Sequence, residues 1–256
     1  MRIPRAEADY LTAVVARLRD LLGDALVGVY PTGSVALDGY RPGRSDLDLI
    51  VVAERPTPAD LAAIAEGLAH PTLPCPATGL ELVLYDRNRL AQLTTEAGFA
   101  LNLNTGRELP AKVETQPGPG PEFWYPIDRD IAQQQRLVLA GPPFAELAPR
   151  LPYPALLPVV ATSVKAHLAS VAEHGDNAVL NGCRALRFQA ERTWSAKPVA
   201  AAWAVRREPT FAPLLTAALD SHRRGRTAGR AVATDQVAAF LGYVLRQLRA
   251  AEAVGG

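Results

Sequence analysis

The sequence predicts an α/β N-terminal domain with a mixed sheet, followed by an all-α helical bundle domain. In the first half of the chain, short apolar segments alternate with segments whose apolar residues recur at helical spacing. From about residue 156 onward the spacing is helical and no segment predicts a strand. Two proline-rich breaks, Gly141-Pro142-Pro143 and Leu151-Pro152-Tyr153-Pro154, lie between these parts. We therefore expect domains at residues 1–150 and 151–256.

The elements of the first domain follow from local patterns, in chain order. Residues 10–22 carry apolar side chains at helical spacing, and Gly23 is suited to end that helix. Residues 25–30, 46–53 and 79–85 are short, apolar segments that predict strands. Within the third of these, Glu81, Val83 and Tyr85 share one face. Helices are expected over 57–69, with a Thr-Pro start, and over 122–135. In the second domain, helices are predicted near 156–173, 177–194, 197–205, 210–222 and 232–252.

Composition narrows the classes of function. The chain has 256 residues, of which 48% are hydrophobic and 21% charged, as in ordinary globular proteins. Its net charge of +1 does not predict a nucleic-acid partner. No apolar run approaches the about 18 residues of a membrane span, and the N-terminus lacks the apolar core of a signal peptide. We therefore expect a cytoplasmic protein, in which Cys75 and Cys183 are buried free thiols.

A pair of aspartates gives the strongest functional signal. Gly33-Ser34 is followed, after eleven residues, by Asp46-Leu47-Asp48 at the start of a predicted strand. Residues i and i+2 of a strand project from the same face, about 6–7 Å apart. Because two carboxylates at this spacing repel each other, a cation between them is favoured. Magnesium prefers oxygen ligands, and we interpret Asp46 and Asp48 as its ligands.

Two neighbouring features fit the same chemistry. The Gly33-Ser34 turn offers backbone N–H groups to phosphate oxygens. Glu81 lies on the next predicted strand, where it is a candidate third carboxylate for the metal and a candidate base for an acceptor hydroxyl. Three carboxylates beside a phosphate-binding turn are typical of in-line transfer at phosphorus with metal assistance.

The segment GSVALDGYRPGRSDLDLIVV resembles the signature of the DNA polymerase β nucleotidyltransferase superfamily. Three later segments are similar to the aminoglycoside 3''-adenylyltransferases, which modify streptomycin and spectinomycin. These are LELVLY at 80–85, EFWYPIDRDIA at 122–132, and NAVLNGCRALRF with WSAKPVAAAWAV within 177–205. The resemblance covers nearly the whole chain and implies a nucleotidyltransferase domain followed by that branch's helical domain. Residues 165–176 depart from the branch, because they contain no tryptophan before the NAVL segment.

The resemblance also implies roles for single residues. Glu81 corresponds to the catalytic glutamate, and Trp124 to a tryptophan that stacks on the substrate, although packing in the core is an alternative for Trp124. Arg184 and Lys197 correspond to the cations that hold the nucleotide phosphates. Asp176 either contacts an amine of the acceptor or caps a helix that begins at Asn177.

We therefore expect magnesium-dependent transfer of AMP from ATP to a hydroxyl of a small molecule, first of all an aminoglycoside or aminocyclitol antibiotic. The expected cofactor is magnesium, as two ions, with ATP as the donor. The expected partner is a small-molecule acceptor, with no nucleic acid and no membrane, and the chain is expected to be a monomer or weak dimer. The alternatives are the same chemistry on a protein or RNA target, and a non-catalytic nucleotide-binding regulator. An intact set of three carboxylates disfavours the regulator, since a protein that only binds nucleotide needs no base.

Overall fold

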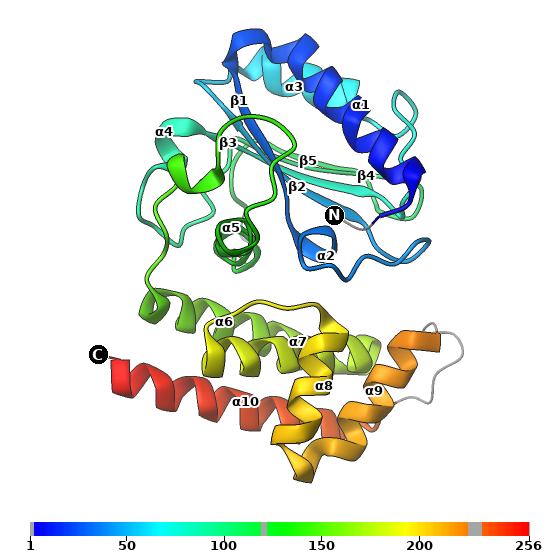
Figure 1. Ribbon diagram of the computed structural model, residues 1–256, viewed down its shortest axis with the longest axis vertical. Coiled ribbons are helices and arrows are strands. Elements are labelled where there is room, and N and C mark those ends of the chain that lie inside the picture. The colour runs from blue at the N-terminus through cyan, green and yellow to red at the C-terminus, as the bar shows by residue number, and fades with distance from the viewer. Residues whose placement is uncertain (1–2, 119–121, 225–231, 256) are drawn as a thin grey trace. The chain divides into compact units, whose positions relative to one another are not determined.

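The computed structural model describes residues 3–118, 122–224 and 232–255 of the chain. These residues form two compact units, Met1–Leu151 and Pro152–Gly256 (Figure 1). The first unit contains a mixed sheet with helices on both faces, and the second is helical. The predicted fold class, an α/β domain followed by an all-α domain, is confirmed. Among the described residues, no helix has the length and apolar character needed to cross a membrane.

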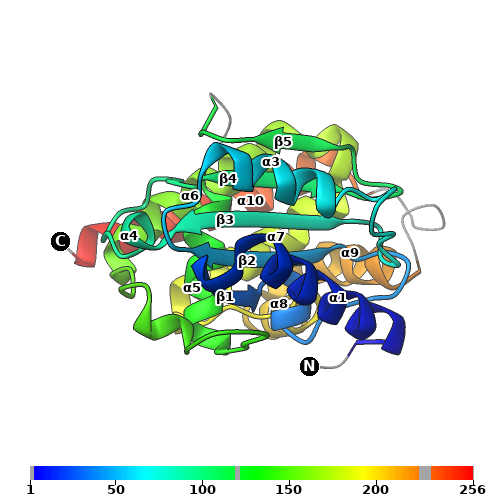
Figure 2. The same cartoon turned by 90° about the horizontal axis from the view of Figure 1, so that it is seen from above.

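The sheet of the first unit has five strands in the order β1-β2-β3-β4-β5, which lie side by side in Figure 2. β2 and β3 are parallel, whereas β1, β4 and β5 each run antiparallel to their neighbours. The strands are β1 (Leu26–Pro31), β2 (Leu47–Ala53), β3 (Leu80–Asp86), β4 (Leu101–Thr105) and β5 (Lys112–Glu114). Only the first three were predicted from the sequence. β4 was missed because its leucines alternate with asparagines, which are depleted in strands, and β5 because it has only three residues.

One face of the sheet is apolar and packs against α1 (Arg5–Leu22) and α3 (Pro58–Gly67). Alternate strand residues point into this core, as the pleat requires. They include Leu47, Leu49, Val51, Leu80, Leu82, Leu84, Leu101 and Leu103. α1 adds the apolar stripe that its helical spacing predicted, and α3 begins with a capping box between Thr57 and Asp60. This core fixes the strand register and with it the residues that face the other way.

The opposite face of the sheet divides into an apolar part and a polar part. Near β1 and β2, Tyr30, Ile50, Val52 and Tyr85 form a second core, which includes Ala132 of α5 (Trp124–Gln135). Two short helices, α2 (Gly33–Ala36) and α4 (Arg87–Leu90), follow β1 and β3. Toward β4 and β5 the residues on this face are Glu81, Asn102, Asn104, Lys112 and Glu114. The polar side chains of β3, β4 and β5 therefore gather on one half of one face of the sheet.

The second unit is built around α7 (Val171–Glu191), which packs against every other helix of that unit. These are α6 (Tyr153–Ala169), α8 (Lys197–Arg207), α9 (Ala212–Arg224) and α10 (Thr234–Gly255). Gly182 allows α7 and α10 to approach closely, since a Cβ there would lie 2.7 Å from a methyl group of Leu241 and 2.9 Å from the Phe240 ring. Cys75 and Cys183 are free and buried, as predicted.

One helix boundary in the second unit was predicted wrongly. The sequence analysis placed the break between 173 and 177, whereas the structure places it at Ser170, whose ψ of 19° is not helical. α7 continues through Gly175-Asp176-Asn177, three poor helix formers, because packing against the rest of the unit outweighs their local preference. Asp176 therefore lies within a helix, and the alternative in which it caps a helix at Asn177 is wrong.

Candidate active site

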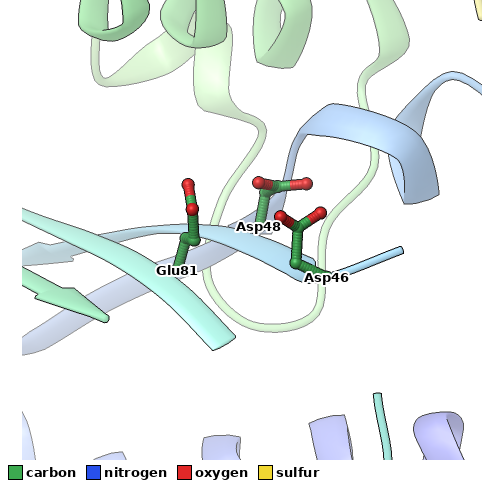
Figure 3. A group of neighbouring side chains, drawn as sticks. All are labelled: Asp46, Asp48 and Glu81. Atoms are coloured by element: carbon green, nitrogen blue, oxygen red, sulfur yellow. The ribbon is translucent and has the colours of Figure 1, made fainter. Parts of the chain in front are cut away.

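Three carboxylates meet at the edge of the polar half-face. Asp46 precedes β2, Asp48 is its second residue, and Glu81 is the second residue of β3. Asp48 and Glu81 are paired across the parallel strands, and Figure 3 shows all three side chains projecting to the same side. One oxygen from each carboxylate lies within 4.8 Å of the others, and all three side chains are half-buried. The spacing on β2 and the strand register together thus produce the group that the sequence predicted.

The turn before α2 holds Asp48 from both its backbone and its side chain. The N–H of Thr32 donates to the carbonyl of Asp48 at 2.9 Å, and the N–H of Ser34 donates to the Asp48 carboxylate. Gly33 has φ +53°, and a Cβ on it would lie 1.8 Å from Oδ2 of Asp48. Glycine is therefore required at residue 33 both for its backbone conformation and for the space it leaves to the carboxylate.

Asp46 is held by the loop between α2 and β2. The hydroxyl of Tyr40 donates to Oε1 of Glu7 at 2.8 Å, which ties this loop to α1 through an acidic side chain that is only 5% exposed. Within the loop, the N–H of Arg41 donates to Oγ of Ser45 at 3.1 Å, and the N–H of Ser45 returns to the Arg41 carbonyl at 2.9 Å. These bonds close the turn directly before Asp46 and fix where its side chain begins.

Burial and mutual repulsion change the acidity of the group. Burial, followed by the charges of Asp46 and Glu81, raises the pKa of Asp48 well above its ordinary value. Burial, followed by the charge of Asp46, raises the pKa of Glu81 to about 7, while the ammonium of Lys112 opposes this rise. Asp128 of α5 adds a further charge that raises the pKa of Asp48. The site therefore favours either protons or a cation among its carboxylates.

Two contributors to this field were not predicted. Asp128 lies three residues after Tyr125 on α5, so helical periodicity places both on neighbouring turns of one face, and this signal was available in the sequence. Lys112 lies on β5, which is too short to be predicted, so no local pattern placed it on the same face as Glu81. Its position depends on the register of β4 with β3 and of β5 with β4.

Arg184 and Lys197 lie in the second unit, on α7 and at the start of α8. The guanidinium of Arg184 stacks over the ring of Trp194 at 5.5 Å from its centroid, and donates to Oδ1 of Asn181 at 3.4 Å. Trp194 in turn stacks on Phe188, with ring centroids 4.3 Å apart. Lys197 follows Trp194 by three residues, so a stacked aromatic pair organises the segment that carries both predicted cations.

The two remaining predicted residues have definite surroundings of their own. Asp176 accepts from the hydroxyl of Ser221 on α9 at 3.1 Å, so its carboxylate links α7 to α9. Trp124 is the first residue of α5, is 43% exposed and lies against the ring of Phe123 at 4.3 Å. Its exposure argues against the core-packing alternative. Contacts of either residue with a substrate stay predictions.

Comparison with known proteins assigns the chain to a family. Residues 11–104 match the family model of the nucleotidyltransferase domain, and residues 146–247 match that of the C-terminal domain of aminoglycoside adenylyltransferases. The chain belongs to the aminoglycoside adenylyltransferase branch of the nucleotidyltransferase superfamily. The predicted resemblance is confirmed, and the protein is a nucleotidyltransferase enzyme. None of the curated protein sequences matches it significantly.

One solved structure supports the fold. The chain is similar to a spectinomycin adenyltransferase, AAD(9) from Enterococcus faecialis, whose crystal structure contains ATP and spectinomycin. The TM-score is 0.71 and the identity 17%, over 94% of this chain and 99% of that chain. A second structure, the CD-NTase CdnG of Bradyrhizobium diazoefficiens with GTP, covers 96% of this chain and 85% of its own. Its TM-score of 0.32 and identity of 15% are too low to support a conclusion.

Gly33 gives a sharp test of how Asp48 is held. We expect Gly33→Ala to lower turnover by about 100-fold, because displacing a catalytic group by about 1 Å can cost that much. Gly23→Ala is the matched control, since Gly23 has the same φ of +53° but nothing within 4 Å of an added Cβ. Both variants should lose about 1–2 kcal/mol of stability from the left-handed backbone, measured by urea unfolding. Equal turnover in the two alanine variants would contradict the role of Gly33.

The raised acidities make the stability of the metal-free protein depend on pH. The pKa of Glu81 rises from 4.5 to about 7 on folding. The stabilisation that comes from protonating Glu81 is therefore fully present below pH 4.5, and it is lost as the pH rises through about 7. The raised pKa of Asp48 acts in the same direction. Asp48→Asn removes one repelling charge, so it should stabilise the protein more at about pH 8 than at about pH 5. Urea unfolding with chelator present measures this, with the exposed Asp20→Asn as control; an equal gain at both pH values contradicts the assignment.

Proposed function

We propose that this enzyme transfers AMP from ATP, with magnesium, to a hydroxyl of an aminocyclitol or aminoglycoside. The observation that carries the proposal is the group of Asp46, Asp48 and Glu81, with oxygens within 4.8 Å of one another, beside the Gly33-Ser34 turn. A group of this kind is costly in a protein that only needs to fold, because it concentrates negative charge in a half-buried place.

The residues present fit magnesium. All three ligand side chains are carboxylates, the hard oxygen donors that magnesium prefers, and they are close enough to share a site for one or two ions. Bound magnesium would neutralise phosphate charge and stabilise the pentacovalent arrangement at the α-phosphorus. Asp46 and Asp48 would then remain ionised and hold the metal, which leaves Glu81 as the carboxylate best able to exchange a proton.

The turn before α2 is suited to the triphosphate. Oγ of Ser34 is buried, and no group in the described part of the chain hydrogen-bonds to it, so it is available to a phosphate oxygen. The absence of a side chain at Gly33 lets a phosphate approach the backbone. For Arg184 and Lys197 of the second unit we keep the predicted role of holding nucleotide phosphates, and the stacking of Arg184 on Trp194 would orient its guanidinium.

Glu81 would act as the base. An acceptor hydroxyl must lose its proton as its oxygen bonds to phosphorus, and a base is most effective when its pKa is near the working pH. Burial and the neighbouring Asp46 bring the pKa of Glu81 to about 7. The oxygen would then attack the α-phosphorus in line, and pyrophosphate would leave on the opposite side.

Two observations support an aminocyclitol as the acceptor. The similar fold of AAD(9) has been solved with spectinomycin, and residues 165–176 of this chain contain no tryptophan to stack on a larger aminoglycoside. For Trp124 in the first unit and for Asp176 in the second, acceptor binding is a separate proposal that follows from the family resemblance. We therefore rank spectinomycin above streptomycin.

Mass spectrometry of candidate acceptors tests the proposal directly. With magnesium and ATP, spectinomycin should gain the mass of one AMP unit, and pyrophosphate should appear only when the acceptor is present. Asp46→Asn and Asp48→Asn, each of which removes one metal ligand, should abolish both products. No AMP adduct on any aminocyclitol or aminoglycoside, from a protein that binds Mg-ATP, would contradict the proposed acceptor class.

The base assignment has its own test. Glu81→Gln should lower the single-turnover rate by about 100-fold or more while leaving Mg-ATP affinity nearly unchanged, because a positioned base contributes about 10²–10⁴-fold. Glu66→Gln, on the exposed side of α3, is the matched control and should behave as the wild type. If Glu81→Gln loses ATP affinity and rate in the same proportion, Glu81 acts only as a metal ligand and the base assignment is wrong.

A further inference from the structure

A row of polar side chains crosses four strands and begins at the catalytic group. Asp48 pairs with Glu81, Glu81 with Asn104, and Asn104 with Lys112, so the four residues share a face on β2, β3, β4 and β5. Neighbouring strands lie about 4.8 Å apart, which places Asn104 one strand beyond Glu81 and Lys112 two strands beyond it. Asn104 is half-buried and Lys112 is exposed. The row thus extends the site away from Asp48.

A second row, one pleat along, holds the first in place. Glu114 pairs with Asn102 across β5 and β4. Nδ2 of Asn102 donates to Oε2 of Glu114 at 2.9 Å and lies 3.1 Å from the hydroxyl of Tyr125, and Nζ of Lys112 donates to the same Glu114 oxygen at 2.8 Å. These bonds from Lys112 and Asn102 lower the pKa of Glu114 and keep it ionised. A fixed carboxylate therefore lies on the same face as Asn104, one pleat along the sheet.

Solvation of an edge strand does not account for this arrangement. Edge strands often carry lysine to discourage pairing with other chains, and Lys112 alone would fit that role. Asn102, however, is only 7% exposed, and its side-chain amide donates hydrogen bonds to Glu114 and Tyr125. A buried amide that orients a partly exposed carboxylate is an organised polar surface. Among the described residues, no group hydrogen-bonds to the carboxamide of Asn104, so it is available to a ligand.

The direction of the row decides which substrate it meets. In-line transfer requires the attacking and leaving oxygens to lie on opposite sides of the phosphorus. The Gly33-Ser34 turn, suited to phosphates, lies on the Asp48 side of Glu81, whereas Asn104 and Glu114 lie on the other side. The attacking hydroxyl, which approaches Glu81, therefore comes from the side of β4 and β5.

We infer that Asn104 and Glu114 bind and orient the acceptor, with Glu114 accepting from a protonated amine and Asn104 bonding to a hydroxyl of a polyhydroxylated, cationic ring. This inference rests on the proposed function and adds the residues of the first unit that select its acceptor. Lys112 and Asn102 hold Glu114 in the ionised, fixed state that an ammonium requires. An acceptor without an amine loses the contact with Glu114, so cationic acceptors are preferred over neutral sugars.

Kinetics with spectinomycin as the probe test the inference. Asn104→Ala and Glu114→Gln should each raise the KM for spectinomycin by about tenfold, because each removes a direct or charge-assisted hydrogen bond, and should leave the KM for ATP within about twofold. Glu114→Gln is nearly isosteric, so it guards against a folding defect in the alanine variant. Val113→Thr is the matched control, since Val113 lies between Lys112 and Glu114, is 56% exposed and points to the other face.

The outcomes separate this inference from the proposed function. Wild-type transfer to spectinomycin with an unchanged acceptor KM in both variants overturns the inference alone. A rise in the KM for ATP equal to that for spectinomycin, or an equal effect of Val113→Thr, also overturns it. A wild-type protein that binds Mg-ATP but transfers no AMP to spectinomycin contradicts the proposed acceptor, and the inference fails with it. Calorimetric titration with spectinomycin gives a test that does not rely on turnover. An affinity about tenfold weaker in Asn104→Ala and Glu114→Gln, but unchanged in Val113→Thr, supports the inference.

Discussion

Asp46, Asp48 and Glu81 repel one another, and the rest of the first unit can be understood as the structure that holds them together. Burial of Asp48, with the charges of Asp46 and Glu81 nearby, makes its ionised form unfavourable in the absence of a cation. If the three carboxylates were on a flexible loop, they would move apart and relieve the repulsion. Here two of the three carboxylates are on paired central strands of a sheet, so the backbone cannot separate them without breaking the ladder of hydrogen bonds.

The sheet can resist this repulsion because one of its faces is a packed apolar core while the other carries the carboxylates. On the face covered by α1 and α3, Leu49, Leu82 and Leu103 belong to a continuous apolar core that fixes the register of β2, β3 and β4. Since side chains alternate along a strand, fixing leucines on one face also fixes which residues point from the other. A register slip by one residue would bury Glu81 in the leucine core, so the cost of such a slip protects the site.

The same logic explains how far the sequence could predict the site. Asp46 and Asp48 are two residues apart on a strongly apolar strand, and Glu81 begins another such strand, so local patterns were sufficient for these residues and for the core of the fold. Asn104 and Lys112 were beyond such reasoning, because their strands are short or polar and their positions depend on pairing with β3. The wrong helix break near Asp176 has a related cause, since packing of α7 outweighs the weak helix preference of Gly175 and Asn177.

The division of the polar half-face suggests how one scaffold can keep its donor chemistry while its acceptor changes. The proposed donor side comprises Gly33, Asp46 and Asp48, and a methyl group added to Gly33 would collide with the Asp48 carboxylate. The acceptor side that we infer lies on β4 and β5, where Asn104 and Glu114 are partly exposed and contribute nothing to the leucine core. Substitutions at these partly exposed positions should cost little stability, whereas substitutions in the turn should disturb both the backbone and the site. Because the constraint of holding three carboxylates together falls on β2 and β3, the polar face of β4 and β5 can vary with the proposed acceptor without disturbing that constraint.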